Sequence, residues 1–281
     1  MEKSYWSLAI LAIAAILIWV AVFAGEQDDC LRVSFFDVGQ GAAVFIEAPN
    51  GNQILVDGGP SSAVLAKLGR AMPFYDRKID LLILTHPDSD HLNGLIEVLD
   101  RYEIGQILET GIIDNTENYR IWQELVKEKN IKVIFARAGQ MVKIADDLQF
   151  KILYPSASIA GQDFTGKTNN ASIVGKLIYG ENEFLLTGDA EKDTESILIF
   201  SGVNLAADIL QVGHHGSKSS TSEQFLAAVA PRQAVIQVGK DNRYGHPTQE
   251  VLERLKNLQV WRNDLHGDVI FACDLAACAK K

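Results

Sequence analysis

The chain has 281 residues, 47% of them apolar, which is enough for one large α/β domain or at most two small ones. Its 36 acidic and 26 basic residues give a formal charge of −10, so the molecule as a whole would repel a polyanion and any contact with nucleic acid must be local. Three cysteines exclude a disulfide scaffold, and none has zinc-finger spacing. Cys273 and Cys278 could form a disulfide bridge or remain two free thiols.

An uncharged apolar segment covers residues 4–25, and as a helix it could cross the ~30 Å of bilayer hydrocarbon. We therefore predict that residues 1–29 form a transmembrane anchor with a short linker and that residues 30–281 form one folded domain. A cleaved signal peptide is the alternative, because Val22–Ala24 loosely fits a cleavage site, and the protein would then be secreted.

The charges around this segment indicate its orientation. Lys3 precedes the apolar residues, and Glu26, Asp28 and Asp29 follow them. Positive charge tends to stay in the cytoplasm, so the sequence predicts that the domain lies outside the cytoplasmic membrane.

Short apolar strands and helical patterns alternate after Cys30, without an internal repeat. Leu31–Phe36, Ala43–Glu47 and Gln53–Asp57 are joined by turns of the kind that close hairpins, and they predict an antiparallel meander. The other expected strands are Leu81–Thr85, Lys132–Phe135, Ser172–Tyr179, Glu183–Leu186, Ile209–Val212 and Ala234–Val238. The expected helices are Leu92–Arg101, Glu117–Lys129 and segments after Asp189, Ser222 and Thr248. This pattern favours sheets covered by helices in two or three layers.

The densest polar cluster follows the strand that ends at Thr85. Residues Thr85–Gly94 contain two histidines and two aspartates within one loop that leads into a helix. One interpretation is that Asp88 to Asp90 only cap a helix beginning at His91. Capping accounts for one acid but not for the histidines on either side, so a metal site is the favoured interpretation.

Similar side chains recur at the ends of later strands. Asp189 follows one strand, and His214 and His215 follow another. Taken singly, they could be a helix cap and ordinary loop residues. However, five of the six histidines lie in loops that contain glycine or proline, and only His266 is expected in a polar turn.

These motifs resemble the metallo-β-lactamase superfamily, and within it the extracellular C-terminal domain of ComEC-type competence proteins. The matching elements are Phe36–Gly41, Val56–Gly59, Thr85–Gly94, Asn169–Ser172, Thr187–Asp189, His214–Ser217 and Tyr244–Pro247. They cover nearly all of the chain after the apolar segment. The resemblance implies an αββα sandwich, with two mixed sheets between helical layers, preceded here by the membrane helix.

The resemblance also implies a centre with two divalent metal ions, manganese or zinc. The implied ligands are His86 and Asp88 for one ion, Asp90, His91 and either His214 or His215 for the other, and Asp189 as the bridge. Where relatives supply another histidine to the first ion, this chain has Asn170 or its neighbour Asn169. An amide is a weak ligand, and a turn in which these side chains bond the backbone is an equal alternative. Oxygen-rich ligands favour manganese over zinc.

Two such ions make water nucleophilic and stabilise an attacked phosphoryl group. The expected catalytic residues are Asp90, Asp189, His215 and His246, and the expected substrate-binding residues are Asp37, Gln40, Ser217, Lys218 and His246. For His246, a structural role in the Gly-His-Pro turn is the alternative. For Ser217 and Lys218 the alternative is solvated surface, which is more often what such runs form.

The resemblance implies a metal-dependent phosphodiesterase or nuclease that acts on DNA outside the membrane. A single helix cannot conduct DNA, so the chain is expected either to act alone or to have a separately encoded channel protein as a partner. Two departures keep other functions open. Relatives commonly have an acid at the position of Ala42, and Asn170 replaces a stronger ligand. The alternatives are a hydrolase of a small ester, lactone or amide, and a binding or assembly module with a weakened site.

Overall fold

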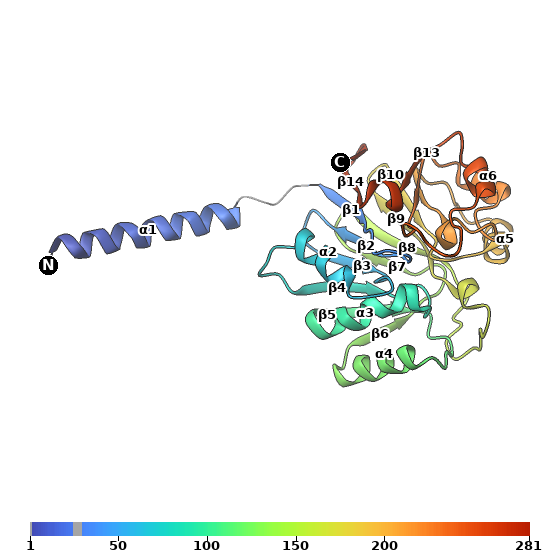
Figure 1. Cartoon of the computed structure of the whole chain (residues 1–281), viewed down its shortest axis with the longest axis horizontal. Coiled ribbons are helices and arrows are strands. Elements are labelled where there is room, and N and C mark those ends of the chain that lie inside the picture. Colours follow the sequence, from blue (N-terminus) through green and yellow to red (C-terminus); the bar gives the residue numbers. More distant parts are fainter. Residues whose placement is uncertain (1, 25–29) are drawn as a thin grey trace.

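A computed structural model describes residues 2–24 and 30–281 (Figure 1). Helix α1 covers Glu2–Ala24, and its side chains from Tyr5 to Trp19 are exposed. No helix in the described part of the chain has both the length and the apolar character required to cross a bilayer. The predicted transmembrane helix is therefore not confirmed, and the predicted linker at residues 25–29 lies outside the described residues.

The domain contains two mixed sheets. The first has eight strands in the order β15-β14-β1-β2-β3-β4-β5-β6. Its strands are β1 Leu31–Phe35, β2 Val44–Glu47, β3 Gln53–Val56, β4 Lys78–Ile83, β5 Glu103–Glu109, β6 Lys132–Phe135, β14 Val269–Cys273 and β15 Cys278–Lys280. The predicted antiparallel meander is confirmed as β1, β2 and β3, and the pairing becomes parallel from β3 to β6.

The second sheet has seven strands in the order β13-β12-β11-β10-β9-β8-β7. Its strands are β7 Met141–Lys143, β8 Leu148–Tyr154, β9 Val174–Tyr179, β10 Asn182–Leu186, β11 Ile209–Gln211, β12 Gln233–Ile236 and β13 Gln259–Arg262. Strands β7 to β10 are antiparallel, and β10 to β13 are parallel. Parallel neighbours place their carboxyl ends at one edge, where loops carry functional side chains.

Helices cover the outer faces of both sheets (Figure 1). They are α2 Ala63–Ala71, α3 Ser89–Arg101, α4 Glu117–Glu128, α5 Lys192–Phe200, α6 Glu223–Val229, α7 Gln249–Arg254 and the short α8 Asn263–His266, with 3-10 turns at Thr168–Ala171 and Gly213–Gly216. A large apolar core, with Phe35, Phe150 and Phe184, fills the space between the sheets. Helices α2, α3 and α4 bury their apolar faces against the first sheet around Leu82 and Trp122, so the expected layered architecture is confirmed.

Several elements escaped prediction for identifiable reasons. Helix α2 has no side-chain cap at Ser62, and edge strand β7 is only three residues long, so neither has a strong local signal. The helix expected at Leu92–Arg101 is confirmed, with a start earlier than expected. Helix α3 already begins at Ser89, and Asp88 occupies the cap position without making a side-chain cap bond. Capping therefore does not account for this carboxylate.

Two glycines allow the loop after β3 to contact helix α3 closely. A Cβ atom on Gly94 would lie 1.8 Å from the carbonyl oxygen of Gly58, and one on Gly58 would lie 2.5 Å from the Leu95 nitrogen. Backbone bonds from Gly58 to His91 and from Gly94 to Gly59 form at this contact. The first turn of α3 is thereby held against the end of β3, which fixes where its polar side chains lie.

The open alternative for the cysteines is resolved at the C-terminus. Cys273 and Cys278 pair across the β14–β15 hairpin and form a disulfide. Among the described residues, Cys30 is a free cysteine. The bridge closes the hairpin that forms one edge of the first sheet.

A buried carboxyl group makes the stability of the domain sensitive to pH. Burial raises the pKa of Glu109 at the end of β5, although its Oε2 accepts a hydrogen bond of 2.8 Å from Trp122 Nε1. Because this pKa is raised in the folded state, the native protein holds the proton more tightly than the unfolded chain does. The free energy of unfolding therefore decreases as the pH rises from the ordinary pKa of a glutamate through the raised pKa of Glu109. Glu109→Gln can keep the bond to Trp122 without the charge.

We therefore expect Glu109→Gln to unfold at a higher temperature than the wild type at neutral pH. The difference in unfolding temperature between the two proteins should shrink as the pH falls below the ordinary pKa of a glutamate, because Glu109 is then uncharged in both the folded and the unfolded state. Thermal unfolding followed by circular dichroism at several pH values measures this. Equal pH dependence in both proteins would contradict the assignment.

Candidate metal centre

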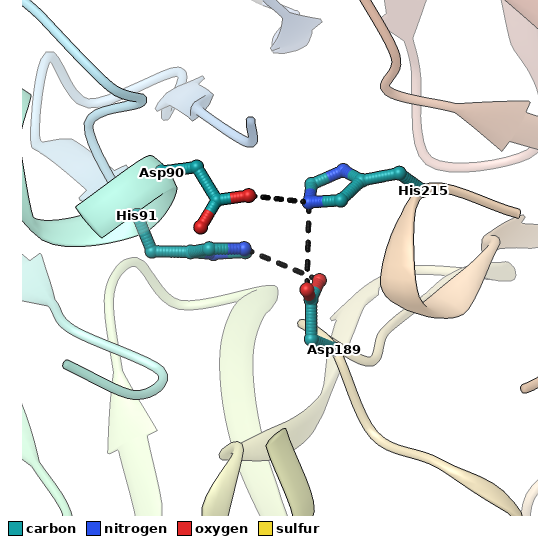
Figure 2. Close-up of side chains that lie close together, drawn as sticks. All are labelled: Asp90, His91, Asp189 and His215. Atoms are coloured by element: carbon teal, nitrogen blue, oxygen red, sulfur yellow. Dashed lines mark ion pairs between the residues drawn. The ribbon is translucent and has the colours of Figure 1, made fainter. Parts of the chain in front are cut away.

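Four side chains converge where the carboxyl ends of strands from the two sheets meet (Figure 2). Asp90 and His91 come from the first turn of α3, Asp189 follows β10, and His215 lies in the turn after β11. One ligand atom of each lies within 4.8 Å of the others. Nε2 of His215 is 3.2 Å from an Asp90 oxygen and 3.4 Å from an Asp189 oxygen, and Nε2 of His91 is 3.2 Å from Asp189.

His91 is held in this position by a carboxylate behind it. Its Nδ1 lies 2.8 Å from Oδ2 of Asp57, which follows β3 and is buried. The same carboxylate accepts bonds from the backbone nitrogen and the hydroxyl of Thr85. An imidazole that donates through Nδ1 presents Nε2 as its ligand atom, so Asp57 orients His91 towards the cluster.

His215 is oriented in the same way by the backbone. Its Nδ1 donates a 2.7 Å hydrogen bond to the carbonyl oxygen of Gln237, which leaves Nε2 directed at Asp90 and Asp189. His214 and His215 have φ values of 47° and 53°, in the left-handed region that non-glycine residues seldom occupy. Such backbone strain is common at functional sites. Of the two histidines between which the sequence left the choice open, the structure brings His215 into the cluster.

His86 and Asp88 lie at the side of the cluster. Nδ1 of His86 is 3.0 Å from the Thr85 hydroxyl and 3.2 Å from the Ser172 hydroxyl, and its Nε2 is 3.8 Å from Oδ2 of Asp88. The Ser172 hydroxyl also accepts a hydrogen bond from the backbone nitrogen of Asp189. Ser172 therefore links the orientation of His86 to the position of Asp189.

Charge distribution within the cluster is uneven. Burial alone would lower the pKa of His91, but Asp189 and Asp57 outweigh it and raise that pKa well above its ordinary value. His215 is likewise raised to a pKa of about 10, since Asp189 and Asp90 overcome its burial. Burial, with nearby His91, lowers the pKa of His86 to about 4. A cation bound here would displace protons from His91 and His215.

The donor set fits a divalent cation. Within residues 2–24 and 30–281, no hydrogen-bond partner was found for the buried Nε2 atoms of His86, His91 and His215. Buried polar atoms are normally satisfied. Nε2 of His91 and Nε2 of His215 have ion-pair contacts with Asp90 and Asp189 at 3.2 to 3.4 Å, and a cation could replace the protons that these contacts need. Imidazole and carboxylate together suit zinc and manganese. The cluster can thus hold at least one such ion through four protein ligands.

His214 and the two asparagines lie beside the cluster and have other partners. His214 Nδ1 is 3.2 Å from Glu191, and its Nε2 is 3.9 Å from Asp189. Asn169 approaches the His214 ring. The amide of Asn170 donates to Glu191 at 3.4 Å and accepts from the Thr194 hydroxyl at 3.1 Å, so the structure does not bring Asn170 into the cluster.

The remaining predicted site residues are spread over the surrounding loops. The His246 ring centroid is 5.6 Å from that of His214, and its buried Nδ1 has no hydrogen-bond partner within the described chain. Gln40 accepts from the backbone of the loop that carries His246. The Ser217 hydroxyl lies 2.9 Å from that of Ser219. Asp37 accepts from the Gly39 nitrogen, and Lys218 is exposed.

Four residues that organise this centre had no role predicted from the sequence. They are Asp57, Ser172, Glu191 and Gln237. Asp57 had a usable signal, because it directly follows a buried strand and precedes a glycine pair. Gln237 acts through its backbone carbonyl, so its side-chain identity could not reveal this contact.

We expect Asp57→Asn to lower the affinity for manganese or zinc roughly 10- to 100-fold, the usual effect of losing an outer partner of a metal-binding histidine. Isothermal titration calorimetry of the purified domain measures this. Asp80→Asn is the matched control, because Asp80 accepts from the Gln53 nitrogen elsewhere in the same sheet. An unchanged affinity in Asp57→Asn would contradict the role assigned to this carboxylate.

Comparison with known proteins agrees with this geometry. The chain is 33% identical over 258 residues to ComE operon protein 3 of Bacillus subtilis and 36% identical over 241 residues to Recombination protein 2 of Haemophilus influenzae. These matches cover 85% and 84% of this chain but only 32% and 28% of the two relatives. Competence protein ComA of Neisseria gonorrhoeae is 30% identical over 267 residues, which cover 94% of this chain and 35% of that protein.

The fold is also found in a solved structure. The metallo-beta-lactamase fold protein YhfI from Bacillus subtilis matches with a TM-score of 0.57 and 14% identity, over 87% of this chain and 100% of that one. The family model described as "Metallo-beta-lactamase superfamily" matches residues 36–240, which include the whole cluster. The chain therefore belongs to the metallo-beta-lactamase superfamily.

Proposed function

We propose that this protein is a metal-dependent phosphodiesterase that cleaves DNA outside the cytoplasmic membrane, in connection with DNA uptake. One observation carries the proposal. The buried Nε2 atoms of His91 and His215 face the carboxylates of Asp90 and Asp189 in a cluster formed from both sheets, and Nε2 of His86 lies beside it without a hydrogen-bond partner among the described residues. The similarity to competence proteins favours DNA over a small ester, lactone or amide as the substrate.

The residues would share two cations between them. Asp90, His91 and His215 would hold one, His86 and Asp88 would hold the other, and Asp189 would bridge them. Divalent cations in such a pair lower the pKa of water and neutralise charge on an attacked phosphoryl group. His91 and His215 are buried, and their contacts with Asp57 and with the Gln237 carbonyl keep both rings in fixed orientations. Little reorganisation is therefore needed when the substrate binds.

The histidines beside the cluster are suited to contact the phosphate. Burial, with nearby His214, lowers the pKa of His246, so this ring is neutral near pH 7 and can donate one N–H to a phosphoryl or leaving oxygen. His214 is oriented by Glu191 and by the Ser219 hydroxyl. Exposed Lys218 and Arg243 could provide local positive charge, which a protein with a formal charge of −10 needs in order to bind DNA.

The proposed location outside the cytoplasm has two supports. The Cys273–Cys278 disulfide is typical of oxidising compartments and rare in the bacterial cytoplasm. The second support is the resemblance of the motifs to the extracellular domain of ComEC-type competence proteins, together with the similarity to Competence protein ComA. The chain spans only about a third of the length of these relatives. A separate membrane channel remains part of the proposal as a partner.

We expect Asp189→Ala to retain the fold but to lose at least one bound metal ion per chain and more than ~100-fold in cleavage rate, because the bridging charge is removed. Elemental analysis and cleavage of single-stranded DNA with manganese measure both effects. Asp193→Ala, which removes an exposed carboxylate on α5, is the control.

Full activity in Asp189→Ala would refute the proposed centre. If the wild type with manganese or zinc leaves DNA intact but hydrolyses a lactone, the small-ester alternative replaces the nuclease proposal. A protein that binds neither metal and cleaves nothing would instead support a binding or assembly module.

Location can be tested in intact cells. We expect a protease added to spheroplasts to degrade the domain without lysis of the cytoplasmic membrane, while a cytoplasmic marker protein survives. Degradation only after lysis would place the domain inside the cell and contradict this part of the proposal.

A further inference from the structure

A cleft of about 590 Å³ opens beside the metal centre. It lies between the starts of helices α3 and α4 and the loop after β12. Its described lining consists of Pro87, Asp88, Ser89, Asp90, Thr116, Glu117, Asn118 and Tyr244. Asp88 and Asp90 are candidate metal ligands, so whatever occupies this cleft is next to the reacting phosphate.

The chemistry of the lining indicates which part of a nucleic acid it fits. Among the described residues that line the cleft, none is lysine or arginine, and Glu117 adds an exposed carboxylate. A phosphate would be repelled from this surface. Hydroxyl, amide and carboxylate groups instead suit the neutral edge of a nucleobase, which offers both donors and acceptors.

Tyr244 supplies the aromatic surface that such a base needs. Its side chain is 55% exposed although it lies beside the cluster. Its ring is stacked on the ring of His246, with 6.0 Å between the two ring centroids and an interplanar angle of 26°. The Arg243 guanidinium lies 5.2 Å from the ring centroid and donates to the Tyr244 hydroxyl at 3.2 Å. An aromatic ring with an adjacent arginine is the combination that binds single strands, through base stacking and charge.

Backbone contacts hold this loop in place. The Asn242 side chain donates to the carbonyl oxygens of Gly239 and His246 and accepts from the backbone nitrogens of Tyr244 and His246. Gln40 accepts from the Gly239 nitrogen at 3.2 Å. The ring of Tyr244 is therefore presented by a loop that is bonded to itself and to the loop between β1 and β2.

We propose that Tyr244 is a specificity-determining residue on which an unpaired nucleobase next to the scissile phosphate stacks, so that the protein selects single-stranded over double-stranded DNA. This inference rests on the proposed phosphodiesterase function. In a duplex the bases are stacked on one another and paired, so their faces are not available to Tyr244. The phosphate itself lies at the metal centre, outside the acidic cleft.

The test compares two strands that differ only in their bases. One is a fluorescent single-stranded oligothymidylate, and the other is a strand of the same length and charge built from abasic sugar units. Dissociation constants are measured by fluorescence anisotropy and cleavage by gel analysis, both with manganese. We expect the wild type to bind the oligothymidylate roughly tenfold more tightly than the abasic strand, the contribution of about one stacked base.

Tyr244→Ala should abolish this preference by weakening binding of the oligothymidylate alone, and Tyr244→Phe, which keeps the ring, should restore it. Phe74→Ala removes an exposed aromatic residue on the loop between α2 and β4 and is the matched control. Equal binding of both strands by the wild type would overturn the inference. If Tyr244→Ala lost the same affinity for both strands, the inference would be overturned too. The ring would then support the phosphate contacts or the folding of the protein instead of binding a base.

The binding and cleavage results separate the two proposals. If DNA is cleaved but the preference does not depend on Tyr244, the stacking inference is wrong and the phosphodiesterase proposal stands. If neither strand is cleaved but the base preference depends on Tyr244, the nuclease proposal fails and the stacking site is retained as a single-strand binding site.

Discussion

The centre depends on a buried chain of alternating charges that crosses from one sheet to the other. Asp57 at the end of β3 contacts His91, and His91 contacts Asp189 at the end of β10. All three side chains are buried, and breaking one partner of such a set leaves an uncompensated charge in the interior. The candidate metal site is therefore also a joint between the two sheets, and a bound cation would replace the protons that now balance the carboxylates.

The backbone around this joint is shaped for function more than for stability. Asp57, His214 and His215 all have positive φ values, and each such non-glycine residue costs on the order of 1 kcal/mol or more. The strain is balanced by the contacts that hold each residue, such as the bonds from Thr85 to Asp57 and from His215 to Gln237. Strain at one ligand of the cluster, His215, and at two residues next to it, Asp57 and His214, is consistent with a site that must present ligand atoms in fixed directions.

Membership of the superfamily does not make the site identical to that of its relatives. The resemblance to the superfamily implied that Asn170 or Asn169 takes the place of a stronger ligand, and the amide of Asn170 bonds Glu191 and Thr194. Ala42 has no carboxylate, yet its backbone nitrogen still donates to the Asp90 carbonyl at 3.2 Å. Asp90, His91, Asp189 and His215 thus provide four ligands for one proposed cation. His86 and Asp88 provide fewer protein ligands for the other. The two proposed cations would be held unequally.

The sequence by itself determined the family, the order of the motifs and the residue types of the centre. These are local features, because each motif is a short stretch of sequence at the end of a predicted strand or the start of a predicted helix. It also predicted the antiparallel meander, since β1 to β3 are joined by short turns. It could not choose between His214 and His215, exclude Asn170 from the cluster, or find the part played by Asp57 and Gln237. Only the tertiary structure decided these points, because side-chain direction depends on backbone torsions and on partners more than twenty residues away. The disulfide was undecided for the same reason: its two cysteines meet only because β14 and β15 pair in that register.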